Sequence, residues 1–176
     1  MVETVSETES APASYPTTSP AVTGNDVAWQ RIESYIAHRF TPRAVEWVVD
    51  GPGLWHPPLK PAAISTVEVW SRAGEWESVE LTASPYGGYA LPCSGPYRFT
   101  AMVGGGSPAP IVPTAVWEAV KRLAAYMTTK PGTPGTSSER IQAGSISIQR
   151  SRSESWMAAA LQNSGAADLL RAYRKV

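Results

Sequence analysis

The sequence has little of the residue types from which compact chemical centres are usually built. Its 176 residues include one cysteine, Cys93, and two histidines, His38 and His56. A single cysteine excludes an internal disulfide and a cysteine-based zinc cluster, and two histidines argue against a histidine-rich metal site. We therefore expect no metal, no cofactor, and a reducing, intracellular compartment.

Long apolar runs are also missing. No stretch approaches the roughly 18 apolar residues that a membrane-spanning helix needs. The first ten residues, MVETVSETES, have neither the basic nor the apolar region of a signal peptide, so we expect none. With 43% hydrophobic residues, the chain can nevertheless bury a core of ordinary size.

Signatures of catalysis are absent as well. The sequence contains no HExxH motif and no Ser–His–Asp or Cys–His set at a recognised spacing. The glycine run at residues 104–106 lacks both the Lys-Ser/Thr of a P-loop and the spacing of a dinucleotide-binding motif. A catalytic carboxylate pair could be sought among Glu75, Glu77 and Glu80. Their positions fit a solvated strand edge better. We therefore expect no enzyme activity.

The net charge is zero, but the charges are unevenly distributed. Residues 1–25 contain three acids and no base, whereas residues 121–176 contain nine bases and three acids. A basic last third could face nucleic acid or an acidic protein, or it could be a solvated surface. Arg140, Arg150 and Arg152 are the first candidates to face DNA.

Two helices are predicted from apolar residues at spacings of three and four. Residues 112–127, VPTAVWEAVKRLAAYM, place Val116 and Val120 on one apolar stripe, and Pro113 fits the first helical turn. Residues 25–40, NDVAWQRIESYIAHRF, repeat the pattern and begin with residues that can cap a helix. We expect the rest of the chain to pack on the helix at 112–127.

Between these helices the hydrophobic period changes to two. Residues 45–49, 64–70 and 97–103 carry strand patterns, and segments rich in glycine and proline separate them. Four or five antiparallel strands are expected over about residues 45–103. The predicted fold class is therefore α+β, with a helical bundle core, an antiparallel β insertion between the first and second long helices, an extended segment and short C-terminal helices.

The first 24 residues are almost entirely Ser, Thr, Pro, Glu and Ala. Such a segment has too little apolar surface to offset the entropy lost on ordering. We predict a flexible N-terminal arm over residues 1–24 and a single domain over residues 25–176.

Seven tryptophans are the strongest positive feature of the composition. They could form a platform that stacks sugar rings or bases. They could instead pack in the core and in interfaces, where tryptophan is enriched, and their spread over every predicted element favours this interpretation.

Several short motifs follow one another in an informative order. PLKPAAI at 58–64 precedes the predicted hairpin, Val112-Pro113 opens the second helix, SERIQAGSI at 138–146 runs extended, and LLRAYR at 169–174 closes the chain. In this order, over about residues 26–176, they resemble the head–tail connector proteins of long-tailed phages and of phage-like gene transfer agents. These proteins are also called adaptor or head completion proteins.

The resemblance implies a homo-oligomeric ring, dodecameric in the particle, between the portal protein and a tail-side stopper or terminator protein. It implies that double-stranded DNA passes through the lumen without sequence specificity. It places the protein at the head–tail junction of a phage or gene transfer agent particle that assembles in the bacterial cytoplasm. It implies no enzyme activity and no membrane.

A ring of this kind needs two different adhesive faces on each subunit. Between subunits we expect the extended segment 141–149, with Ile141, Ile146 and Ile148. Toward the portal or another partner we expect the end of the chain, with Leu169, Leu170, Tyr173 and Arg174. The alternative is a monomeric glycan- or nucleic-acid-binding β module with a Trp-lined surface.

Overall fold

A computed structural model describes residues 2–106, 110–129, 138–143, 146–151 and 156–174. The chain divides into two compact units. The sheet unit comprises residues 1–16 and 37–111, and the helical unit comprises residues 17–36 and 112–176. None of the helices in the described residues is long and apolar enough to cross a membrane.

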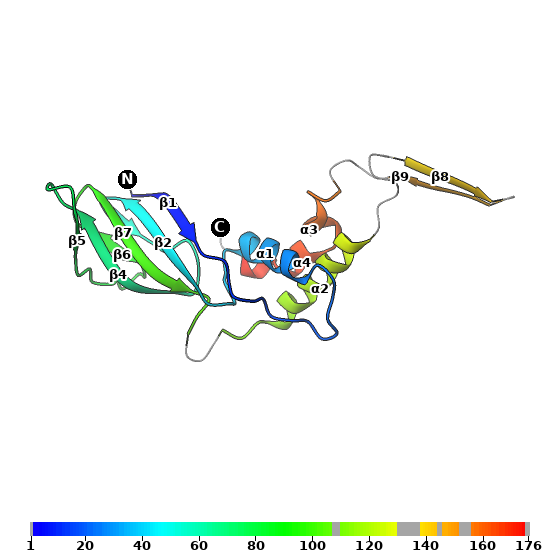
Figure 1. The fold of residues 1–176 in the computed structure, drawn as a ribbon, viewed down its shortest axis with the longest axis horizontal. Coiled ribbons are helices and arrows are strands. Elements are labelled where there is room, and N and C mark those ends of the chain that lie inside the picture. Colours follow the sequence, from blue (N-terminus) through cyan, green and yellow to red (C-terminus); the bar gives the residue numbers. More distant parts are fainter. Residues whose placement is uncertain (1, 107–109, 130–137, 144–145, 152–155, 175–176) are drawn as a thin grey trace. The chain divides into compact units, whose positions relative to one another are not determined.

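A five-stranded antiparallel sheet dominates the sheet unit (Figure 1). Its order across the sheet is β1 (Glu3–Glu9), β2 (Arg43–Asp50), β7 (Pro96–Val103), β4 (Ala62–Trp70) and β5 (Trp76–Ser78). A second, two-stranded sheet pairs β3 (Gly53–Trp55) with β6 (Tyr89–Leu91).

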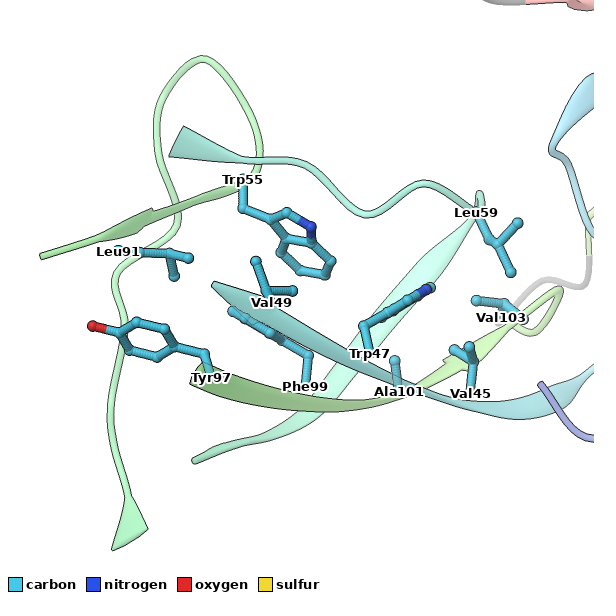
Figure 2. Packing of buried hydrophobic residues seen from close by; sticks show 10 residues of the cluster. All are labelled: Val45, Trp47, Val49, Trp55, Leu59, Leu91, Tyr97, Phe99, Ala101 and Val103. Carbon is cyan, nitrogen blue, oxygen red and sulfur yellow. The ribbon is translucent and has the colours of Figure 1, made fainter. Parts of the chain in front are cut away.

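One face of the large sheet carries the core of this unit. Strand β7 alternates, so that Tyr97 and Phe99 are buried as the sequence pattern predicts, and Phe99 lies opposite the buried Trp47 of β2. Trp55 of β3 covers them, with its ring centroid 4.2 Å from that of Phe99 and 5.5 Å from that of Trp47. Figure 2 shows the ten buried residues of this cluster; nine come from the two sheets, and Leu59 comes from the loop between β3 and β4.

The N-terminal strand differs from the expectation of a flexible arm over residues 1–24. Strand β1 pairs with β2 along the edge of the sheet. Polar side chains of β1 accept hydrogen bonds from buried indoles of the core. The indole N–H of Trp47 donates to Glu7 at 2.7 Å, and that of Trp55 donates to Thr4 Oγ1 at 2.9 Å. A polar segment is ordered here because it completes a backbone ladder and satisfies indole donors of the core.

The helical unit contains the two predicted long helices. They are α1 (Asn25–Ile36) and α2 (Thr114–Thr128), which pack together with Trp29 and Trp117 edge to face at 5.2 Å. The apolar stripe of α2 is buried, as its spacing predicts. Helix α1 ends four residues earlier than the pattern suggests, because Ala37 adopts a positive φ of 53°.

The rest of this unit is made of short elements. Strands β8 (Ser138–Ala143) and β9 (Ile146–Ser151) form an antiparallel pair. Helices α3 (Ala160–Asn163) and α4 (Ala166–Leu169) are single turns, and a 3-10 turn, Arg171–Tyr173, follows.

The predicted helical bundle core is wrong. The described part of the chain is mainly β-sheet, with two helices of 12 and 15 residues and two single-turn helices. The stretch expected to be an insertion joins β1 to build a sheet with its own buried cluster. The C-terminal segment forms no long helix because Gly165, at φ 73°, interrupts it.

Candidate interaction surfaces

The most buried charges of the sheet unit form a clamp around Glu9, at the end of β1. Its carboxylate accepts from Arg39 Nε at 2.5 Å and Arg39 Nη2 at 2.8 Å, and Arg43 Nη1 lies 3.3 Å away. The arginine side chains are only 7% and 5% exposed. Burial alone raises the pKa of the Glu9 carboxyl, but the hydrogen bonds and charges of Arg39 and Arg43 outweigh it, so the pKa lies below its usual value. The clamp holds the N-terminal segment in place, so its role is structural.

An exposed aromatic surface lies at the other edge of the same sheet. Trp70 and Trp76 are cross-strand partners of β4 and β5, and their rings meet edge to face at 5.1 Å. The guanidinium of Arg98 lies 4.6 Å from the ring centroid of Trp76 and forms a 2.6 Å ion pair with Glu68. Trp70 is 44% exposed. Aromatic and arginine side chains of this kind are enriched at protein interfaces.

Acidic residues lie next to this aromatic pair in sequence but face the other side of the hairpin, because side chains alternate along a strand and Glu77 is the cross-strand partner of Val69. Glu75 occupies the turn before β5, Glu77 lies in β5, and Glu80 follows it; all three are exposed. Arg72 is an exposed base in the same turn. We call residues 70–80 the hairpin tip. It combines an exposed indole with a net negative charge.

The helical unit carries a basic hollow. A cavity of about 420 Å³ opens between α1 and the C-terminal turns. The guanidinium of Arg174 lies 5.1 Å from the ring centroid of Tyr35, and Arg171 reaches Asp168 at 3.6 Å on an exposed surface. We call this the arginine hollow, and it is lined by Tyr35, Gln162, Ala167, Asp168, Arg171 and Arg174.

A second open cavity, of about 530 Å³, adjoins it through Tyr35. Its lining includes Arg31, whose guanidinium donates to the backbone oxygen of Ala158 at 3.4 Å. Three arginines therefore flank one tyrosine on this side of the helical unit. Such a site suits an anion, because guanidinium groups pair with carboxylates and phosphates in a planar, two-pronged geometry.

The four residues predicted to form a C-terminal partner face differ in their exposure. Leu170 is fully buried within the helical unit, and Leu169 is half-buried. Tyr173 is 37% exposed, and Arg174, which lines the arginine hollow, is exposed. Only the last two therefore lie on the surface available to a partner.

The predicted inter-subunit isoleucines fall in the β8–β9 pair. Ile141 is paired with Ile148, and Ile146 with Ala143. Among the basic candidates for DNA, Arg140 is paired with Gln149, and Arg150 with Glu139. Arg152 lies outside the described residues.

Six of the seven tryptophans are at least partly covered. Trp29, Trp47 and Trp55 are buried, the tryptophans at 76, 117 and 156 are half-buried, and Trp70 is exposed. This distribution supports the interpretation as packing residues rather than a Trp-lined binding groove. No three His, Cys, Asp or Glu side chains gather as metal ligands would within the described residues.

Comparison with known proteins gives a likeness of fold. No protein-family model and no curated protein matches the chain. The chain is similar to one in a solved structure described as the neck of an empty gene transfer agent (GTA) particle computed with C6 symmetry. The two are 18% identical over 86% of this chain and 76% of that one, with a TM-score of 0.51. A chain from the neck of a native GTA particle computed with C12 symmetry is 16% identical over 86% of this chain and 80% of that one, with a TM-score of 0.48.

At this level of identity the likeness shows a shared fold. It confirms the resemblance to head–tail connector proteins in that respect, because a chain of a GTA neck has the same fold over most of its length.

Proposed function

We propose that the chain is a structural head–tail connector (adaptor) subunit in the neck of a phage or gene transfer agent particle. The observation that carries the proposal is the fold shared with a GTA neck chain over 86% of this chain. The C6 symmetry applied to that neck is consistent with a closed ring of identical subunits.

In this proposal the ring lies between the portal protein and a tail-side stopper or terminator protein. Double-stranded DNA passes through its lumen without sequence-specific contacts. The role is structural rather than catalytic, and assembly takes place in the bacterial cytoplasm. Exposed Tyr173 and Arg174 are the proposed contacts to the portal, and the β8–β9 pair, with Ile141, Ile146 and Ile148, is a proposed contact between subunits.

The chain's own surfaces suit such a role. A head-to-tail ring needs two faces that differ from one another. The chain offers an acidic, aromatic surface on the sheet unit and a basic hollow on the helical unit. These are features of binding surfaces for proteins rather than of a site for chemistry on a small substrate.

Gene disruption in the organism that encodes the chain tests the proposal. Without the chain, we expect DNA-filled heads and free tails that fail to join, seen by negative-stain electron microscopy. Supplying the wild-type gene in trans should restore complete particles. Complete, infective or gene-transferring particles in its absence would contradict the proposal.

A further inference from the structure

Strands β8 and β9 form a sheet of their own, in which they run antiparallel (Figure 1). Among the described helices and strands, each makes extensive contacts only with the other. Each therefore has an outer edge along which no other described strand exchanges backbone hydrogen bonds with it. A two-stranded pair is marginally stable at best in water, and a further strand on its edge stabilises it.

The register gives the β8–β9 pair two unlike faces. Because residues alternate between the faces along each strand, residues opposite one another share a face. The apolar residues all share one face, and they are Ile141, Ala143, Ile146 and Ile148. Glu139 and Arg150 lie opposite each other on the same face. The other face holds only polar residues, namely Ser138, Arg140, Gln142, Ser147, Gln149 and Ser151.

We propose that the outer edge of β8 in one copy of this chain pairs, antiparallel, with the outer edge of β9 in a second copy. Four strands then form one sheet, with a continuous apolar face and a continuous polar face. The inference deepens the proposed function, on which it rests for the ring, because it says how one subunit of that ring holds the next.

The match between β8 and β9 favours a second copy as the occupant of these edges. Within the chain, Ile141 lies opposite Ile148, and Glu139 lies opposite Arg150. If this register recurs between copies, Ile141 has an isoleucine on both sides and Glu139 has an arginine on both sides. Cross-strand pairs of these kinds stabilise a sheet, whereas like charges opposite one another destabilise it. An offset of two residues, which strand tilt in a closed sheet calls for, keeps every residue on its face.

The outward backbone groups match as well. In an antiparallel pair, residues that exchange hydrogen bonds alternate with residues whose N–H and C=O groups point away from the partner. In the recurring register, the outward groups of β8 therefore stand opposite the outward groups of β9. The edge strands of the large sheet offer a poorer match, because β1 has one apolar residue, Val5, and β5 has three residues in all.

A contact between β8 and β9 of different copies is head-to-tail. It leaves an outer β8 edge at one end of an assembly and an outer β9 edge at the other, so further copies add until a ring closes. Closure covers every outer edge. In such a sheet, the β8 strands of neighbouring copies are separated by a β9 strand, and thus by about 9–10 Å.

Disulfide formation between chains tests the pairing. In a Cys93→Ser background, a chain with Arg140→Cys is mixed with a tagged chain that carries Ser147→Cys, Gln149→Cys or Ser151→Cys. The three mixtures sample the recurring register and its two offsets. Oxidation at high concentration should give a disulfide-linked heterodimer in at least one mixture, because cysteines can bridge only when their Cα atoms lie within about 7 Å.

Two outcomes overturn the inference. One is that no mixture, in solution or in purified particles, gives more heterodimer than a control that mixes Arg140→Cys with Glu46→Cys, at an exposed position of β2. The other is a disulfide-linked homodimer of Arg140→Cys alone. In that case β8 would meet β8, and the contact would be symmetric rather than head-to-tail.

Charge reversal provides the second measurement. Glu139→Arg and Arg150→Glu should each weaken self-association of the purified chain about fivefold in sedimentation equilibrium, because like charges then meet across the contact. An equimolar mixture of the two variants should associate more tightly than either alone, since the introduced arginine can meet the introduced glutamate of the other chain. A mixture that associates no better than its components contradicts the pairing. Glu46→Arg is the control and should change nothing, and circular dichroism establishes that each variant is folded.

Particles separate this inference from the proposed function. If the chain is present in purified particles and no mixture cross-links there or in solution, the neck role stands and the pairing is refuted. If a mixture cross-links in solution and the chain is absent from particles, the pairing stands and the neck role is refuted.

Discussion

Replacing Glu9 by glutamine tests whether the clamp holds the N-terminal strand in place. The change keeps the size of the side chain but removes the carboxylate that joins Arg39 and Arg43. Both arginine side chains are less than a tenth exposed, so the loss falls on charges that water reaches poorly.

The expected cost is at the lower end of the range for a broken buried pair. Removing one partner of such a pair costs about 3–5 kcal/mol. Glu9 itself is 21% exposed, and glutamine can still accept a hydrogen bond, so we expect about 3 kcal/mol. For a unit of this size, that loss lowers the melting temperature by roughly 12–24 °C.

The effect should depend on pH in a defined direction. The pKa of Glu9 is lowered in the folded chain from its usual 4.5. A lowered pKa means that the clamp's contribution is complete above the unfolded-state pKa and is lost as the pH falls through the folded-state pKa. The stability difference between wild type and Glu9→Gln should therefore be constant near neutral pH and shrink as the pH falls below the usual pKa of 4.5.

Differential scanning calorimetry of the whole chain measures both effects. Glu46→Gln, on an exposed position of β2, is the matched control and should change stability by no more than about 0.5 kcal/mol. If Glu9→Gln melts within about 2 °C of wild type at neutral pH, the clamp contributes little and the reasoning fails. A difference that persists unchanged in acid would show that the carboxylate charge is not its source.

Three further predictions concern the core, the backbone and DNA. Leu170→Ala should destabilise the helical unit by about 2–5 kcal/mol, because Leu170 is fully buried. Leu169→Ala should cost less, because Leu169 is half-buried. An unchanged melting temperature for Leu170→Ala would contradict its place in the core and support a contact with a partner. Gly104→Ala should cost more than about 2 kcal/mol, because φ is +68° and a Cβ would lie 2.2 Å from the Thr41 carbonyl oxygen. Gly105→Ala should be near neutral, because a Cβ there would lie 3.8 Å from its nearest neighbour. Thermal unfolding measures both. The purified chain should bind duplex DNA weakly and without sequence preference in fluorescence anisotropy, since a DNA passage should not grip its cargo; tight binding with a steep salt dependence would contradict this.

The elements with a strong internal period could be predicted from the sequence. Residues at spacings of three and four bury one stripe of α2, and alternation in β7 buries Tyr97, Phe99, Ala101 and Val103. These patterns are local, because each element displays its own buried face.

Strand β1 could not be found in this way. Its residues are polar, and its partners lie 30 to 51 positions away: Arg39 for Glu9, Trp47 for Glu7, and Trp55 for Thr4. A donor buried in the core needs an acceptor, but the sequence does not say which segment supplies it. Because β1 carries no strand pattern, the sequence predicts only the strands at about residues 45–103, which by themselves resemble an insertion into a helical core.

The candidate surfaces could not be predicted from the sequence either, because they too depend on contacts between distant residues. Tyr35 in α1 meets Arg171 and Arg174 only through the fold, so no motif marks the arginine hollow. A continuous helix would have placed Leu170 and Tyr173 on one face. The chain instead changes from α4 to a 3-10 turn, which buries Leu170 and leaves Tyr173 partly exposed.

Electron cryomicroscopy of purified particles tests the central claim most directly. The account predicts a ring of identical copies in the neck, next to the portal, into whose density the sheet unit and the helical unit of this chain each fit. Peptides of the chain should be found in the same particles by mass spectrometry. A neck whose density is fully explained by other proteins, in particles that contain no peptide of this chain, would contradict the account.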